Sequence, residues 1–266
     1  MNKILVVGGS GVLGSSVVAT LQQEQADFLS GSRKPIKNDS YSVVSQSTNT
    51  PWQRIDLATG EGLRQALEGV DTVFHLASAP TKIGNEPFDV VATRNLLNAL
   101  NQSDVKHLIY SSIVGVDTIQ YSYYRAKRSA ERLIQASQIP YTILRATQFH
   151  NLLDFAIGKL LSLPIGFIPR QLKVQPIHVD TVTAELYRLV QAGPQQTIIN
   201  LGGPKVYDVG TMTQLWMKAR NVSKPVIPIP TVGSLMKSLA KGENTCPNKK
   251  AIDSADWEEY LRETYG

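Results

Sequence analysis

Residues 3–14 read KILVVGGSGVLG, an apolar run that leads into a glycine-rich turn in which Gly8, Gly11 and Gly14 are spaced three residues apart. The run is typical of a buried strand, and Gly8 permits a tight turn out of it. Gly11 lets the backbone approach a phosphate group, and Gly14 allows the following helix to pack closely on the sheet. Because the free N–H groups at the start of that helix attract phosphates, we expect a dinucleotide to be bound by Gly8, Ser10, Gly11, Val12, Leu13 and Gly14.

Strand-like and helix-like patterns alternate beyond this turn. Short apolar runs predict parallel strands at 3–8, 26–31, 53–56, 72–77, 105–111 and 140–144. Helical periodicity predicts helices at 12–25, 60–68, 89–101 and 123–137. Strands that alternate with helices through short loops imply right-handed crossovers. The sequence therefore predicts an α/β protein with a doubly wound, Rossmann-like parallel sheet.

The remaining segments are less regular. Residues 39–51 are rich in Ser, Thr and Asn and predict an irregular loop or a weak edge strand. After residue 145 the alternation loosens and prolines punctuate shorter elements. We expect one NAD(P)-binding domain over 1–266, in which 1–145 form the dinucleotide-binding core. Residues 146–266 then form mainly a substrate-binding lobe over the carboxyl ends of the strands, where ligands bind in such sheets.

The end of the second predicted strand bears on the choice of dinucleotide. NAD-selective sites usually place an acidic residue there to hold the ribose 2′-hydroxyl. Here the strand ends in Ser32, Arg33 and Lys34, and Asp27 stands at its other end. Arg33 can clamp a 2′-phosphate in a bidentate manner, with Lys34 as a second cation. We therefore expect NADP rather than NAD.

Several motifs together make the chain similar to the atypical and extended short-chain dehydrogenases/reductases, in particular the NmrA-like and NAD(P)H-binding branch. The resemblance lies in the glycine spacing and in the segments Asp56-Leu57, Ala77-Ser78-Ala79, 110–115, 123–127, 144–147 and 177–180. It implies that Asp56 and Leu57 contact adenine and that Ala77 and Ser78 line the adenosine and its ribose.

The resemblance also implies catalytic roles for Ser112, Tyr123 and Lys127. Tyr123 and Lys127 form a YxxxK pair that begins a predicted helix 11 residues beyond Ser112. Residues i and i+4 share a helix face, so Lys127 can stabilise negative charge on Tyr123. Tyr123 then exchanges a proton with a carbonyl oxygen, Ser112 hydrogen-bonds that oxygen, and Lys127 also binds the nicotinamide ribose.

Neighbouring residues leave alternatives open within this motif. Ser111 is an alternative to Ser112 as the catalytic serine. Tyr124 and Arg128 have the same spacing as Tyr123 and Lys127, shifted by one residue, and Tyr121 also lies close to the motif in the sequence.

Composition excludes several other classes of protein. The net charge of +5 comes from scattered Lys and Arg, whereas a nucleic-acid binder concentrates them on one face. A single cysteine, Cys246, forbids an intrachain disulfide, and no apolar run reaches membrane-spanning length. The four histidines show no metal-ligand spacing; we expect His75 to be a packing residue, whereas His150 or His178 can reach a substrate. We expect a cytoplasmic protein that binds a small-molecule substrate, without a metal, nucleic acid or membrane; the oligomeric state is open.

Three functions are compatible with these features. The first is an NADP(H)-dependent oxidoreductase that acts on a small carbonyl or quinone-like substrate. The second is a non-enzymatic NADP(H) sensor of the NmrA type, which has no need of a proton-donating tyrosine. The third is a sugar-nucleotide epimerase or dehydratase with tightly held NAD, against which the basic residues Arg33 and Lys34 argue.

Overall fold

A computed structural model describes residues 3–35, 50–248 and 254–266. The chain forms two compact units that are interleaved in the sequence. Unit 1 comprises Met1–Ser112, Arg125–Leu144 and Val182–Ile199, and unit 2 comprises Ile113–Tyr124, Arg145–Thr181 and Asn200–Gly266. The division expected at residue 145 and the cap over the strand ends stay predictions.

Unit 1 is built on a seven-stranded sheet. In spatial order the strands are β11 (Thr197–Leu201), β8 (Tyr141–Ala146), β7 (His107–Ile113), β4 (Thr72–His75), β1 (Ile4–Val7), β2 (Phe28–Ser32) and β3 (Trp52–Arg54). From β3 to β7 every neighbouring pair is parallel. The strand order reverses between β1 and β4, which is where ligands bind in doubly wound sheets.

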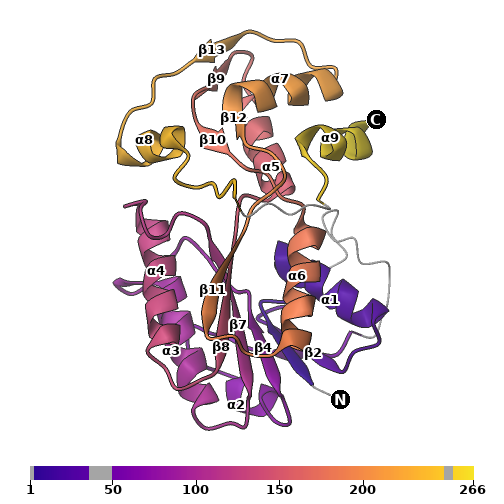
Figure 1. Cartoon of the computed structure of the whole chain (residues 1–266), viewed down its shortest axis with the longest axis vertical. Coiled ribbons are helices and arrows are strands. Elements are labelled where there is room, and N and C mark those ends of the chain that lie inside the picture. The colour runs from indigo at the N-terminus through magenta and orange to yellow at the C-terminus, as the bar shows by residue number, and fades with distance from the viewer. Residues whose placement is uncertain (1–2, 36–49, 249–253) are drawn as a thin grey trace. The chain divides into compact units, whose positions relative to one another are not determined.

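Helices cover both faces of this sheet (Figure 1). They are α1 (Val12–Gln23), α2 (Leu63–Ala66), α3 (Phe88–Leu100), α4 (Ser122–Gln135) and α6 (Val179–Ala192). On one face, α3 and α4 pack on β4 and β7 in a single apolar cluster. On the other, α1 and α6 lie side by side, and Ser16 Oγ is 2.8 Å from Thr183 Oγ1. A two-stranded hairpin of β5 (Lys82–Ile83) and β6 (Glu86–Pro87) precedes α3.

Burial explains why the first strands could be recognised. All four residues of β1 are buried, as expected of a central parallel strand covered on both faces. Successive side chains point to opposite faces, so Leu5 and Val7 lie in the cluster with α3 and α4. The predicted α/β fold with a doubly wound parallel sheet is confirmed, and each of the six predicted strands and four predicted helices has its counterpart. The seventh strand, β11, was not predicted, and the stretch 39–51 lies almost entirely outside the described residues.

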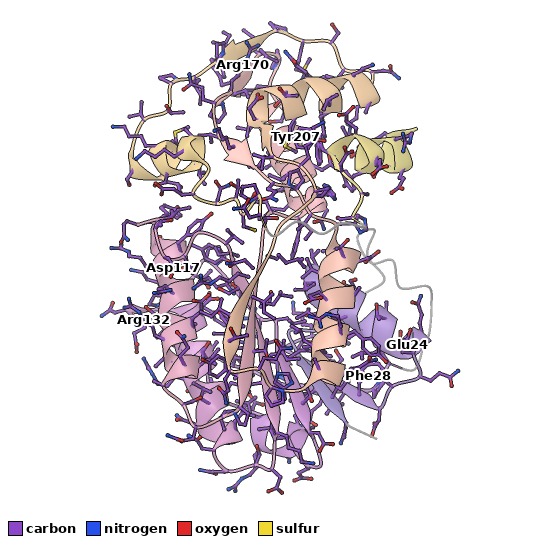
Figure 2. The ribbon with its side chains drawn as sticks, in the orientation of Figure 1. Glu24, Phe28, Asp117, Arg132, Arg170 and Tyr207 are labelled. Atoms are coloured by element: carbon purple, nitrogen blue, oxygen red, sulfur yellow. The ribbon has the colours of Figure 1, made fainter. Side chains whose placement is uncertain are left out.

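Unit 2 has a smaller core of its own. Its elements are α5 (His150–Leu160), β9 (Gly166–Ile168), β10 (Lys173–Val174), β12 (Tyr207–Asp208), α7 (Val209–Ala219), β13 (Val226–Pro228), α8 (Ser234–Lys241) and α9 (Trp257–Tyr265). The apolar side chains of α5, α7 and α9 pack together around Trp216 and the fully buried Trp257. Figure 2 labels two of the buried aromatic residues, Phe28 in unit 1 and Tyr207 in unit 2.

Candidate functional site

A groove of about 200 Å³ lies in unit 1 at the carboxyl ends of the central strands. It is lined by the loops that follow β1, β2, β3 and β4. The structure brings nine of the predicted cofactor residues together in its wall: Gly8, Ser10, Gly11, Ser32, Arg33, Asp56, Leu57, Ala77 and Ser78. Val12, Leu13, Gly14 and Lys34 adjoin these positions in the chain, and Lys127 is not part of the wall.

The three glycines of the first turn are required for different reasons. Gly8 has a φ of +95°, and a Cβ there would lie 2.6 Å from the backbone nitrogen of Ala77. A Cβ on Gly14 would lie 2.1 Å from the carbonyl oxygen of Gly8, so only glycine lets α1 start this close to the turn. A Cβ on Gly11 would meet only that oxygen, at 3.4 Å. Gly11 therefore leaves open space beside the backbone, on the side of the groove.

The start of α1 offers free hydrogen-bond donors to this space. Gly11 is the N-cap residue, and in the part of the chain that the structure describes no side-chain cap accepts a hydrogen bond from the first turn. The first N–H groups of a helix have no partner within the helix and carry a partial positive charge. An anionic group in the groove would supply the missing acceptors.

The end of β2 contributes a cation to the same groove. Arg33 is exposed and lines the groove, whereas Ser32 is buried. The Ser32 hydroxyl accepts a hydrogen bond from Trp52 Nε1 (3.0 Å) and donates one to the carbonyl of Lys34 (2.5 Å), which fixes this turn. The nearby carboxylate of Asp56 accepts the N–H of Ala58 (2.9 Å). Among the described residues, the guanidinium of Arg33 takes part in no ion pair.

Lys127 lies in a dry environment beside the sheet. Its side chain is 4% exposed, and its Nζ is 3.2 Å from Asp89 Oδ1 of α3. The Nζ also donates a hydrogen bond to the carbonyl oxygen of Ser111 (3.0 Å) and lies 4.8 Å from the centre of the Tyr110 ring. Sequence reasoning missed Asp89, because a lone acid in the first turn of a helix ordinarily serves the helix dipole.

The two candidate serines of β7 point to opposite faces of the sheet, because side chains alternate along a strand. Tyr110 belongs to the cluster formed with α3 and α4. Ser112, two residues further on, shares that face, which is also the face over which Lys127 lies. Its Oγ is buried and has no hydrogen-bond partner among the described residues. A buried hydroxyl without a partner is unfavourable unless a ligand supplies one.

The candidate tyrosines lie in and just before the first turn of α4. Tyr123 precedes Lys127 by one helical turn, so the two share a helix face. Tyr124 contacts the Tyr123 ring edge-on, with ring centres 6.3 Å apart. Burial, together with the neighbouring Tyr123, raises the pKa of Tyr124 to about 12. Tyr121 is 47% exposed and lies outside the helix.

The histidines form no group that could hold a metal ion within the described parts of the chain. Burial, reinforced by the charge of Lys127, lowers the pKa of His75 to about 3. Its Nε2 is 2.9 Å from Thr93 Oγ1, which agrees with the packing role expected for it. In unit 2 the ring of His150 stacks on Tyr260 at 4.9 Å and lies 5.8 Å from His178.

Burial raises the pKa of the Cys246 thiol to about 11, which disfavours the reactive thiolate.

Within the ranges that the structure describes, no helix is long and apolar enough to cross a membrane.

Known proteins resemble this chain in sequence and in fold. A sequence model of the NAD(P)H-binding family matches residues 8–156. A 3-beta-hydroxysteroid dehydrogenase of Mycolicibacterium neoaurum is 26% identical over 123 residues, which are 42% of this chain and 32% of that protein. The chain thus spans about a third of the length of this curated relative.

Two solved structures cover nearly the whole chain. A nucleoside-diphosphate-sugar epimerase from Staphylococcus aureus has a TM-score of 0.76 at 18% identity, over 98% of this chain and 100% of that one. An NADPH-dependent quinone oxidoreductase from Escherichia coli has a TM-score of 0.76 at 17% identity, over 99% of this chain and 100% of that one. At these identities the two structures support the fold alone.

Proposed function

Since this chain belongs to the NAD(P)H-binding family, we propose that it is an NADP(H)-dependent oxidoreductase that transfers hydride to or from a small carbonyl or quinone-like substrate. The observation that carries the proposal is that one groove is lined both by the glycine turn and by Arg33. A nicotinamide dinucleotide follows from the family. The choice of NADP and the reaction are the proposal.

The residues present fit such a dinucleotide. Gly11 and the N-terminus of α1 suit the pyrophosphate. Arg33 suits a 2′-phosphate, because its planar guanidinium binds phosphate in a bidentate manner. Asp56 and Ala77 line the same groove and are the residues that we propose for the adenosine part.

When bound, the dinucleotide supplies or accepts the hydride. We assign the proton to the Tyr123 hydroxyl, which donates it to the substrate oxygen during reduction and takes it back during oxidation. Lys127, one turn further along α4, offers its ammonium group to the nicotinamide ribose and to Tyr123. The Ser112 hydroxyl, which has no partner among the residues that the structure describes, donates a hydrogen bond to the same substrate oxygen.

Two observations favour these residues over their neighbours. A tyrosine whose pKa is raised to about 12 is a poor proton carrier near neutral pH, which argues for Tyr123 rather than Tyr124. Ser112 rather than Ser111 shares the sheet face of Lys127. Within the described ranges the Ser112 hydroxyl also has no hydrogen-bond partner, and a substrate would supply one.

Two other functions remain as outcomes of the test. The groove by itself would equally serve a sensor that binds NADP(H) without turnover. The third candidate function is that of an epimerase or dehydratase with tightly held NAD. The basic residues at the end of β2 argue against that third reading, because NAD-selective sites usually have a carboxylate there.

The test is NADPH consumption by the purified protein over a panel of quinones, aldehydes and ketones. Tyr123→Phe is compared with Tyr121→Phe, a control at an exposed tyrosine outside the helix. We expect turnover that falls at least 100-fold in Tyr123→Phe, the range of one general acid, and is unchanged in the control. Loss of turnover in Tyr124→Phe alone would favour the shifted register. NADPH binding without any turnover would favour the sensor, and purified protein that carries bound NAD would favour the epimerase.

A further inference from the structure

The ion pair between Lys127 and Asp89 is buried on both sides. The two side chains are 4% and 1% exposed, and Nζ lies 3.2 Å from Oδ1. Exposed ion pairs such as that of Lys106 with Asp71, whose lysine side chain is 75% exposed, contribute little. Burying two charges is unfavourable unless their geometry is good and further hydrogen bonds support them. Further hydrogen bonds to Asp89 and Lys127 are therefore expected to stabilise the pair.

Asp89 has further partners in the wall of the groove. The hydroxyl of Ser78 donates a hydrogen bond to Asp89 Oδ1 (2.8 Å), and the N–H of Ala79 donates one to Oδ2 (3.4 Å). Both residues belong to the loop after β4 that lines the groove. The carboxylate thus joins the groove wall on one side to the ammonium group of Lys127 on the other.

Lys127 is held from the strand side as well. Its ammonium group donates to the Ser111 carbonyl (3.0 Å) and lies against the Tyr110 ring. A lysine side chain has four rotatable bonds and loses about 2 kcal/mol of conformational entropy when fixed. Contacts from Asp89 of α3 and from Tyr110 and Ser111 of β7 restrict this freedom before any ligand arrives, which is preorganisation.

We infer that Asp89 is a positioning residue, which through Ser78 and Lys127 couples the wall of the dinucleotide groove to the lysine that meets the ribose. This inference rests on the proposed role of Lys127 as a cofactor-binding residue. Ser78, which the sequence placed among the residues lining the ribose, then acts through Asp89.

A purely structural role for Asp89 makes a different prediction. Asp89 lies in the first turn of α3, where an acidic side chain stabilises the helix. In that case its removal would lower the unfolding midpoint but leave the affinity of the folded protein for NADPH unchanged. The affinity for the dinucleotide is therefore the readout that separates the two roles.

The experiment is a double-mutant cycle on the dissociation constant for NADPH, measured by fluorescence titration of folded protein. The variants are Asp89→Asn, Lys127→Met and their combination. Each single change is expected to raise Kd about 10- to 100-fold, the loss of one charge-assisted hydrogen bond. Because Asp89 acts through Lys127, the double variant should bind no more weakly than the weaker-binding single variant.

Two further variants complete the design. Ser78→Ala keeps the carboxylate of Asp89 and should raise Kd less than Asp89→Asn does. It should have no effect in a protein that also carries Lys127→Met. Ser78→Ala takes the place of Asp89→Asn in the cycle if Asp89→Asn does not fold. Asp71→Asn removes the acid of the exposed pair with Lys106 and should leave Kd unchanged.

Three results would overturn the inference: wild-type affinity in Asp89→Asn, additive effects in the double variant, or a rise in Kd in Asp71→Asn as large as that in Asp89→Asn. The cycle needs no turnover, so it distinguishes this inference from the proposed function. A protein that binds NADPH but reduces nothing would refute the oxidoreductase while the cycle still tests Asp89. A protein that binds no dinucleotide would refute both.

Discussion

Gly14 and Gly11 form a matched pair for testing the glycine turn. A Cβ on Gly14 would lie 2.1 Å from the Gly8 carbonyl oxygen and 2.8 Å from the Gly9 Cα. Both are backbone atoms that cannot rotate away, so α1 and the turn must move apart by about 1 Å. Overpacking of this kind costs about 1–3 kcal/mol, and we expect the upper part of that range. Gly14→Ala should therefore lower the melting temperature by roughly 5–10 °C.

Gly11→Ala should leave the stability nearly unchanged and weaken the binding of NADPH. Gly11 has φ −82°, which alanine adopts freely, and its Cβ would meet only one atom, at the ordinary contact distance of 3.4 Å. Stability should change by less than about 1 kcal/mol, the usual effect of alanine at an N-cap. The added methyl group would occupy the space that we propose for the pyrophosphate, so Kd for NADPH should rise at least about tenfold.

Thermal unfolding followed by circular dichroism, together with titration with NADPH, measures both effects on the same protein samples. If Gly14→Ala melts within 1 °C of the parent protein, the close approach of α1 to the turn is wrong. If Gly11→Ala binds NADPH as well as the parent protein, the phosphates do not lie at this turn and the proposed use of the groove fails.

Three further predictions concern cofactor choice, pH and unit 2. Arg33→Glu should weaken NADPH binding about 10- to 100-fold, the range of a charge-assisted hydrogen bond, and leave NADH binding nearly unchanged; equal losses for both dinucleotides would remove Arg33 from the 2′-phosphate site. Burial lowers the pKa of His75 and His150 to about 3 and that of His107 to about 4. The unfolded chain, with histidine pKa values near 6.5, takes up these protons first as the pH falls. The free energy of unfolding should therefore be steady above about pH 7 and fall between pH 6.5 and 4 by about 1 kcal/mol per pH unit for each histidine. His150→Phe should make this dependence on pH, measured by urea unfolding, less steep. An unchanged pH dependence in the variant contradicts the assignment. Asp154 accepts hydrogen bonds from three aromatic side chains of α7 and α9. Asp154→Ala should therefore destabilise the protein by about 3 kcal/mol without altering NADPH binding at the groove of unit 1. An unchanged midpoint of urea unfolding would refute this prediction.

The fold was predictable where one local pattern dominates. The fully buried run of β1 and the glycines after it could be recognised without tertiary information. By contrast, α2 covers only Leu63–Ala66 rather than the predicted 60–68, because Gly60, Gly62 and Gly69 adopt positive φ angles that helices exclude. No residue of strand β11 is buried, so β11 lacks the buried apolar run by which the central strands were recognised.

The candidate site was predictable to a different extent. Its glycine turn and basic strand end are contiguous in the sequence, and their residues line one groove. The partner of Lys127 was not predictable, because Asp89 belongs to another helix and the contact depends on how α3 and α4 pack on the sheet. The face of Ser112 depends on the register of β7, which a sequence pattern defines only to within a residue or two.

The interleaving of the two units bears on the order in which the chain can fold during synthesis. Domains generally fold as they emerge, from the N-terminus onward. Unit 1, however, draws its last segment from Val182–Ile199. The nascent sheet therefore presents the free edge of β8 until β11 has left the ribosome, and such an edge invites pairing with other chains. We expect chains that are truncated before residue 197 to aggregate, and chaperones that shield strand edges to matter most in that interval.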